Sequence, residues 1–205
     1  MKTPMVRLSA MFMCAAAVLC GPALAQEKET NRQPDEAAMM EAWAKIAAPG
    51  EHHQHLKLYA GKWKQANKWR MTPEAPWIES EGQASAEFIF DGRFLMQKVK
   101  GAPVFGDQPF EGLGIVGYDN YKKQYVSTWI DSMGTMIVMM HGTCDGSGKT
   151  ITFRGEMDDP MSGSKLKLRV VYRSQGPDKY DMEYYMTGPD GNEFHSMTIA
   201  HTRGA

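Results

Sequence analysis

Hydrophobic and polar residues alternate along most of the chain, with a period of two that begins at Gly61. Every second position of the segment that follows holds an aromatic or amide side chain, namely Trp63, Gln65, Asn67 and Trp69. Two of the three residues between them are Lys. Because successive side chains of a β-strand point to opposite faces, this pattern predicts a strand with one face toward solvent and one toward a core or lumen.

The same alternation returns in short runs as far as the C-terminus, and turn residues such as Gly, Asp, Asn and Pro separate most of the runs. The predicted strands are 61–71, 78–90, 93–101, 109–120, 124–131, 134–142, 150–157, 164–174, 179–188 and 193–203. No helical periodicity lies between them, so neighbours are expected to pair as an antiparallel meander. A meander of about ten strands must protect its edges, which favours an all-β, up-and-down barrel of the lipocalin or calycin type. A β-sandwich is the alternative.

The first 60 residues follow different patterns. A basic start, an apolar run and the small-x-small triplet Ala23-Leu24-Ala25 predict a signal peptide over residues 1–25, cleaved after Ala25. Residues 26–60 are expected to form a polar linker and short N-terminal helices, followed by a barrel domain over 61–205. The protein is therefore expected in the periplasm or outside the cell. The mature chain has no apolar run long enough for a transmembrane helix.

The charge balance and the absence of several catalytic motifs reduce the number of possible functions. The formal net charge is −1, and charges of opposite sign are interspersed, so nucleic acid is not an expected partner. No serine-nucleophile elbow, phosphate-binding loop or metalloprotease helix is present. Cys144 alone follows the predicted cleavage site, and the adjacent Asp145 should raise its thiol pKa, so a structural role is favoured over a nucleophilic one. The sequence predicts no catalytic residue and leans against an enzyme.

Gly61-Lys62-Trp63 resembles the Gly-x-Trp that opens the first strand of lipocalin-like barrels after a short helix. In that class the Trp lies at the closed end, and an Arg of the last strand packs across its ring as a cation–π contact. Arg203 stands near the end of the last predicted strand. The resemblance implies that Gly61, Trp63 and Arg203 close the barrel.

A wider set of motifs resembles an uncharacterised family of secreted bacterial proteins, catalogued as a domain of unknown function and grouped with the calycin-like barrels. The motifs are Glu51-His52 with Leu56, Gly61-Lys62-Trp63, Gly92-Arg93-Phe94-Leu95, Pro109-Phe110-Glu111-Gly112, Gly117-Tyr118-Asp119-Asn120, Gly155-Glu156, Asp159-Pro160 and Gly163. This resemblance implies a calycin-like barrel and no particular reaction or ligand. A looser similarity to haem-binding barrels of the nitrobindin type rests on the Gly-x-Trp opening.

Inward-facing aromatic and amide side chains are the candidates for ligand contact. They are Trp63, Gln65, Asn67, Trp69, Tyr118 and Trp129. The aromatic rings would supply apolar walls, and the two amides could orient a ligand among them. The alternative is a core that these same side chains fill.

Three strand histidines add a possible metal or haem ligand. If Arg203 turns inward, period-two geometry turns His201 and His195 inward as well, unless a β-bulge lies between them. His141 has the same ambiguity in its own strand. An inward His could ligate haem or bind a polar ligand, whereas a hydrogen-bonded wall histidine is the simpler interpretation.

Two further groups are weaker candidates. His52 and His55 stand three residues apart on a predicted helix, but a zinc site would need ligands that the sequence does not place nearby, so no metal is predicted. Four methionines crowd one predicted hairpin, where they would line an adaptable pocket or fill the core. They are Met133, Met136, Met139 and Met140.

The favoured interpretation is a secreted small-molecule-binding barrel for an apolar or amphipathic ligand. One alternative is a haem- or metal-binding barrel that uses a histidine of the last strand. The other is a non-catalytic envelope interaction module.

Overall fold

The computed structural model describes residues 35–104, 106–159, 162–188 and 190–204. The predicted signal peptide and its cleavage site after Ala25 lie outside these residues. The chain divides into two compact units, Met1–Asp35 and Glu36–Ala205, and the second unit contains every helix and strand described below.

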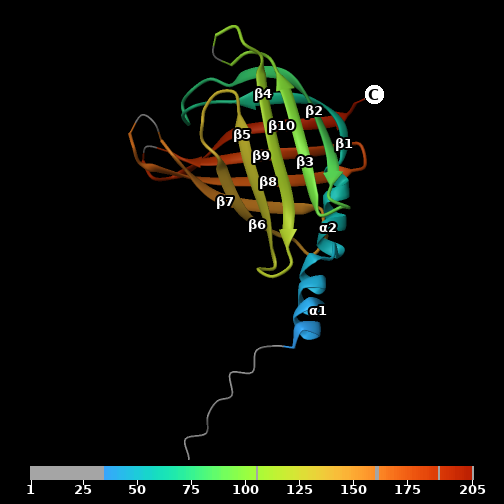
Figure 1. Cartoon of the computed structure of the whole chain (residues 1–205). Coiled ribbons are helices and arrows are strands. Elements are labelled where there is room, and N and C mark those ends of the chain that lie inside the picture. The colour runs from blue at the N-terminus through green and yellow to red at the C-terminus, as the bar shows by residue number, and fades with distance from the viewer. Residues whose placement is uncertain (1–34, 105, 160–161, 189, 205) are drawn as a thin grey trace, which may run out of the picture. The chain divides into compact units, whose positions relative to one another are not determined.

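Short helices precede ten strands, as the sequence pattern predicts (Figure 1). The elements are α1 (Glu36–Ala47), α2 (Glu51–His55), the 3-10 helix η1 (Leu56–Tyr59), β1 (Gly61–Trp69), β2 (Ile78–Ile89), β3 (Phe94–Gly101), β4 (Phe110–Asp119), β5 (Gln124–Asp131), β6 (Val138–Cys144), β7 (Thr150–Asp158), β8 (Lys165–Gly176), β9 (Lys179–Thr187) and β10 (Glu193–Arg203). None of the described helices combines the length and the apolar content that crossing a membrane requires.

The ten strands form one closed antiparallel barrel. Each strand pairs with its neighbours in sequence, and β1 pairs with β10 to complete the circle. The closing register sets Trp63 opposite Arg203 and Trp69 opposite Met197. Closure leaves no free edge strand, which is the reason a long meander adopts it. The predicted up-and-down barrel is confirmed, and the β-sandwich is excluded.

One end of the barrel, here called the helical end, is covered by α2 and η1. Leu56 and Tyr59 of η1 belong to the same buried cluster as the barrel residues Trp63, Phe153 and Tyr180. The Trp63 Nε1–H donates to the carbonyl of Tyr59 at 3.0 Å, and the Tyr59 hydroxyl donates to the Lys149 carbonyl at 2.9 Å. The main core therefore lies at this end. The opposite end, where the β1–β2, β3–β4, β5–β6, β7–β8 and β9–β10 loops meet, is here called the mouth.

The C-terminus of α1 is held by the two turns beside it. Arg93 Nε donates to the Ala47 carbonyl at 2.9 Å, and Asn120 Nδ2 donates to the carbonyls of Ile46 and Ala48 at 2.8 Å. These bonds satisfy carbonyls that a helix end leaves without intrahelical partners. No residue of α1 is buried, so its apolar face makes little contact with its own barrel.

Candidate functional site

The inward-facing side chains of the barrel form two levels. Toward the helical end they are buried, as Trp63, Tyr125 and Phe153 illustrate. Toward the mouth the inward-facing Trp69 and Trp129 are only partly buried. The barrel is therefore filled by its own side chains at the helical end, and its inward-facing side chains become partly exposed toward the mouth.

Four polar side chains, Gln65, Asn67, Ser80 and His201, form what we call the amide site on the interior of β1, β2 and β10. Gln65 is 4% exposed, and its Nε2 lies 2.9 Å from His201 Nε2. Asn67 Nδ2 donates to Ser80 Oγ at 3.4 Å. Gly82 provides room for this arrangement, because a Cβ there would lie 2.8 Å from Gln65 Oε1.

One acceptor of the amide site is left without a partner. Asn67 Oδ1 is buried, and no hydrogen-bond donor reaches it from the described part of the chain. Buried polar side-chain atoms are nearly always hydrogen-bonded, so this acceptor is available to a water molecule or to another donor. The site can accept a hydrogen bond from a molecule that enters between the aromatic side chains.

His201 faces inward, as predicted, and is 1% exposed. Its ring stacks on Tyr180 with centroids 3.8 Å apart, and burial lowers its pKa from 6.5 to about 3. The neutral ring donates from Nδ1 to the Ile199 carbonyl at 3.2 Å, which leaves Nε2 to accept from the Gln65 amide. Both ring nitrogens are thus engaged, and a haem iron could reach neither without displacing one of these partners.

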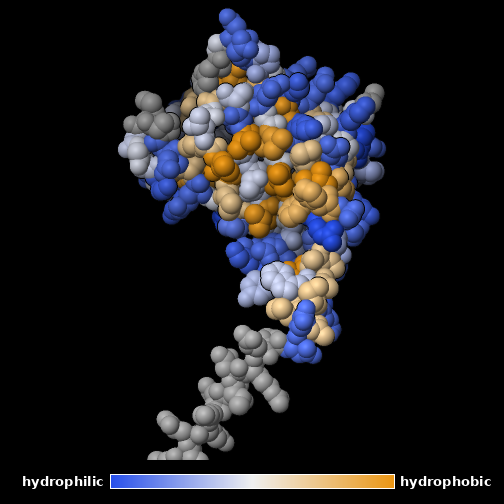
Figure 2. All heavy atoms as spheres, in the orientation of Figure 1, coloured by the Kyte–Doolittle hydropathy of each residue, from blue (hydrophilic) through white to orange (hydrophobic). Residues whose placement is uncertain are grey.

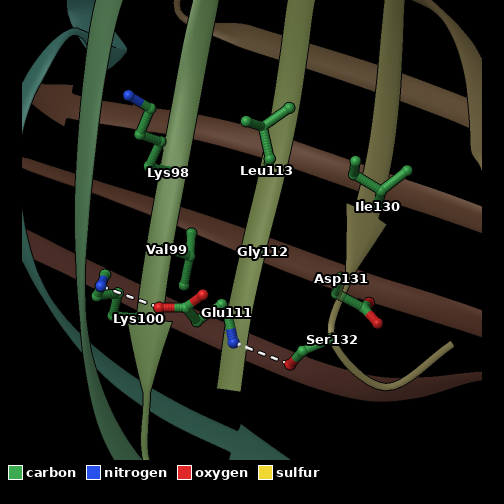
Figure 3. A pocket seen from close by; sticks show the side chains of 9 residues that line it. All are labelled: Lys98, Val99, Lys100, Glu111, Gly112, Leu113, Ile130, Asp131 and Ser132. Carbon is green, nitrogen blue, oxygen red and sulfur yellow. Dashed lines mark hydrogen bonds and ion pairs between the residues drawn. The ribbon is translucent and has the colours of Figure 1, made fainter. Parts of the chain in front are cut away.

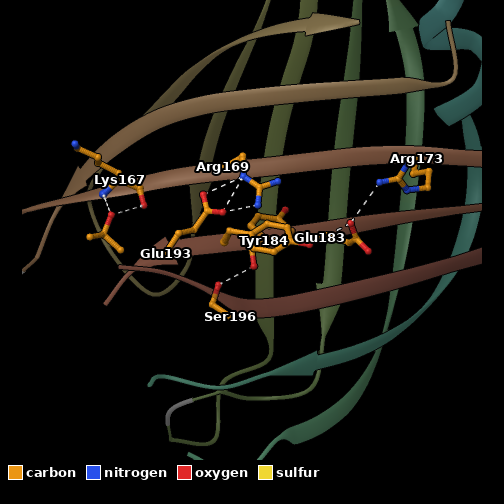
Figure 4. Close-up of polar contacts among 9 residues, drawn as sticks. Lys167, Arg169, Arg173, Glu183, Tyr184, Glu193 and Ser196 are labelled. Atoms are coloured by element: carbon orange, nitrogen blue, oxygen red, sulfur yellow. Dashed lines mark hydrogen bonds and ion pairs between the residues drawn. The ribbon is translucent and has the colours of Figure 1, made fainter. Parts of the chain in front are cut away.

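His195 does not face inward, because the β-bulge that would break the period-two inference is present. A register shift between His195 and Met197 inserts an extra residue into β10, which turns His195 to the outer face. There its ring stacks on Tyr185, with centroids 5.0 Å apart. Arg169 also lies over the Tyr185 ring and pairs with Glu193 (Figure 4). His195 belongs to a surface ladder of aromatic and charged groups, away from the amide site.

His141 also lies on the outer face, where it is exposed opposite Val126 and 3.2 Å from Gln124 Nε2. It therefore cannot contact a ligand inside the barrel. Of the four clustered methionines only Met140 is buried. Met133 and Met136 lie in the exposed loop before β6, and Met139 lies on the outer face of β6 opposite Thr128. The expectation that the cluster fills the core is wrong for these three, although Met136 lines a hollow on the surface.

The remaining predicted aromatic residues occupy both levels of the barrel. Tyr118 lies at the helical end, stacked on His52 with centroids 4.0 Å apart, so it is remote from the mouth. Trp129 lies in the mouth half, and its Nε1–H donates to Asp131 Oδ2 at 2.8 Å. Its ring occupies the space that Gly112 and Gly114 leave by lacking side chains. Trp63 is buried below the amide site, next to Tyr180.

The sequence suggested Tyr125 only as a possible aromatic wall residue and did not predict that it joins the helical segment to the barrel. Its hydroxyl lies 2.8 Å from His55 Nδ1 and 3.4 Å from His52 Nδ1. The neighbouring His53 is buried and accepts from the Gly50 N–H at 3.0 Å, so it caps α2. Among the described residues no group of three His, Cys, Asp or Glu side chains could hold a metal ion. The hydrogen bonds of these histidines anchor the helical end.

Cys144 also contacts this anchor through a hydrogen bond to Tyr125. Burial raises the pKa of its thiol, and the charge of Asp145 raises it further. The direction predicted from the neighbouring acid is confirmed, although burial is the larger cause. A thiol with a raised pKa is a poor nucleophile at neutral pH.

Comparisons with known proteins give one family match and several similar solved structures. The family described as "Protein of unknown function (DUF1579)" matches residues 48–203, and no curated protein matches the chain. Rv2717c from M. tuberculosis is similar in structure, with a TM-score of 0.55 at 13% identity, covering 77% of this chain and all of that one. The S-type phycobiliprotein lyase CPES from Guillardia theta has a TM-score of 0.49 at 10% identity, with coverages of 77% and 99%. A redesigned β-barrel has a TM-score of 0.40 at 17% identity, with coverages of 74% and 96%.

Proposed function

Because the chain belongs to the DUF1579 family of proteins of unknown function, its function must be inferred from its own geometry, and we propose that it is a secreted carrier of a small apolar or amphipathic molecule. The ligand would lie in the mouth half of the barrel. Its apolar body would contact Trp69 and Trp129, and a polar group would reach the amide site. The predicted signal peptide supports export to the periplasm or beyond.

The unpaired acceptor Asn67 Oδ1 is the observation that carries this proposal. A buried polar atom without a hydrogen bond costs about 1–3 kcal/mol of folding stability. The Gln65 amide nitrogen donates to His201 and does not reach Asn67 Oδ1. A ligand with a hydroxyl, an amide N–H or a protonated carboxyl group would supply the missing donor. We therefore infer that the ligand is amphipathic and donates a hydrogen bond.

The rim of the mouth supports entry of such a molecule. Met71 and Trp77 on the β1–β2 loop are exposed, as are Met133 and Met136 on the β5–β6 loop. Exposed apolar groups gathered on one end of a soluble domain commonly mark a binding entrance. Methionine side chains are flexible and would adapt to ligands of varied shape.

The test compares two ligands that differ only in the donor. Delipidated mature protein is titrated with a long-chain alcohol and with its methyl ether, and binding is followed by tryptophan fluorescence and calorimetry. We expect the alcohol to bind the wild type at least tenfold more tightly than the ether, and Asn67→Leu to remove this difference. Lys68→Leu is the matched control, because Lys68 is the next residue and faces outward. Equal binding of both ligands, or of neither, would refute the proposal.

The haem alternative receives no support from the two histidines of the last strand. His201 is enclosed by Gln65, Tyr180 and the Ile199 carbonyl, and His195 lies on the outer face. The interaction-module alternative concerns the outer surface of the barrel and of α1.

A further inference from the structure

We propose that the protein forms a symmetric homodimer in which α1 of each protomer packs on the outer wall of the partner's barrel. The proposal rests on two apolar surfaces of the same chain, each of which is exposed in the structure. It is independent of the ligand proposed for the barrel interior.

The first surface is one face of α1. It is formed by Met39, Met40, Trp43 and Ile46, all of which are exposed; Met40 is 64% and Trp43 is 63% exposed. A helix of this length is marginal on its own, and packing of its apolar face normally supplies most of its stability. The hydrogen bonds at its C-terminus attach the helix to its own barrel but do not cover the apolar face. The apolar face of α1 is therefore available to pack on another surface.

The second surface lies outside the barrel, on β3–β6. We call it the apolar wall, and it consists of Phe94, Met96, Leu113, Ile115, Val126, Ile130 and Met139. Strand pairing places Met96 beside Ile115 and Leu113 beside Ile130, so the side chains are contiguous. Figure 2 shows hydrophobic side chains gathered where β3, β4 and β5 lie in Figure 1. The outer face of β1, by contrast, carries Lys62, Lys64 and Lys68.

The apolar wall contains a hollow suited to a large side chain. This hollow has a volume of about 420 Å³ and is lined by Leu113 and Ile130, among others (Figure 3). Polar and charged side chains line it as well, namely Lys98, the Lys100–Glu111 ion pair with its N–O distance of 2.9 Å, Asp131 and Ser132. An indole ring is flat and apolar, and Trp is the residue type most often found at the centre of protein interfaces. Trp43 is the most prominent side chain of α1 that could enter it.

Charge favours a second copy over a membrane. α1 carries Glu36, Glu41 and Lys45, so it lacks the cationic face that membrane-surface helices present. Its acidic first turn suits Lys98 of the wall, whose contact with Glu87 is long at 4.0 Å, whereas Lys100 is already paired with Glu111.

Two-fold symmetry follows from the arrangement. If α1 of one protomer covers the wall of its partner, the same contact in the reverse direction covers the remaining helix and wall. Such an interface closes on itself and leaves neither surface exposed.

The test measures the mass of mature protein in solution by light scattering and sedimentation from 1 to 100 µM. We expect a dimer for the wild type, and at least a tenfold weaker dimer for Trp43→Glu and for Ile130→Glu. Met71→Glu is the control, since Met71 is equally apolar and exposed but lies on neither surface. Circular dichroism confirms that each variant is folded. A monomeric wild type, or a dimer that tolerates both substitutions, would overturn the proposal.

Mixing the two variants gives a stricter result. The Ile130→Glu protomer keeps an intact α1, and the Trp43→Glu protomer keeps an intact wall, so the mixture restores one of the two contacts. We expect heterodimers in the mixture at concentrations where each variant alone is monomeric. A mixture as monomeric as its components would contradict the reciprocal arrangement. Flotation of a monomeric wild type with phosphatidylcholine vesicles would instead identify a lipid surface as the occupant.

Discussion

Gly61 leaves open the space that the guanidinium of Arg203 occupies, at the point where the first and last strands meet. The backbone of Gly61 has a φ of +123°, and a Cβ at this position would overlap Arg203 Nη1. Nη1 donates to the Ala60 carbonyl at 2.7 Å, and the guanidinium carbon lies 3.8 Å from the centre of the Trp63 ring. The three residues that the lipocalin-like resemblance singles out therefore form one closure contact.

Replacement of Gly61 should be costly for two separate reasons. Gly61→Ala forces a side chain into a backbone region that L-residues rarely adopt, and it displaces Arg203 from Trp63. We expect a loss of at least about 2 kcal/mol in the free energy of unfolding, measured by urea denaturation. Gly146→Ala is the control, because Gly146 has open space around it and no positive φ. If the two substitutions cost the same, the close approach of Arg203 is not important for stability.

Loss of the Arg203 guanidinium should weaken closure by a smaller amount. Arg203→Ala removes the cation–π contact and the hydrogen bond to Ala60, for an expected loss of about 1–3 kcal/mol. Arg173→Ala is the matched control on the outer face, where Arg173 lies 3.7 Å from Glu183 (Figure 4), and it should cost less than about 0.5 kcal/mol. Equal losses in urea denaturation would show that Arg203 behaves as an ordinary surface arginine.

His201 should make the protein sensitive to mild acid. Burial lowers its folded-state pKa from 6.5 to about 3, so between these values the unfolded chain binds a proton that the folded chain excludes. Stability must therefore fall as the pH falls below 6.5. The contribution of this one residue to the free energy of unfolding should decrease by about 2 kcal/mol between pH 7 and pH 5.

The His201→Gln variant isolates this effect, because Gln can still bond to Gln65 and does not titrate. Its stability should vary less steeply with pH than that of the wild type, in urea titrations at pH 5, 6 and 7. His53, whose pKa burial also lowers, is present in both proteins and cancels in the comparison. His141→Gln is the control, since His141 is exposed. Parallel pH profiles for the wild type and His201→Gln would show that His201 is not held neutral.

The fold could be predicted from sequence because each strand of a closed meander pairs with its neighbours in sequence. Period-two alternation identifies all ten strands, and the short turns leave each strand few possible pairing partners. β6 shows where the alternation fails: the apolar residues before Val138 continue the pattern, yet they lie in an exposed loop. α1 shows a different limit, because its spacing predicts a helix but does not reveal that the apolar face points away from its own barrel.

The candidate site was predicted only in part, for physical reasons. The period-two alternation correctly predicted that Gln65, Asn67 and His201 face inward. One inserted residue in β10 gives His195 the opposite orientation. Bulges of this kind leave no clear signal in a single sequence. The role of Tyr125 depends on contacts with residues about 70 positions away, which alternation cannot indicate.

Cys144, the only cysteine after the predicted cleavage site, should react slowly in the folded protein. Its thiol is partly buried and next to Asp145, and these two causes raise its pKa, although the hydrogen bond from Tyr125 lowers it by a smaller amount. The thiolate is the reacting form, so we expect at pH 8 a rate with a chromogenic disulfide at least tenfold lower than in urea. Asp145→Asn should accelerate the native reaction by removing a negative charge beside the thiol, whereas Asp91→Asn, at an exposed turn away from Cys144, should not. A native rate equal to the unfolded rate would instead indicate an accessible, activated thiol and would reopen a nucleophilic role.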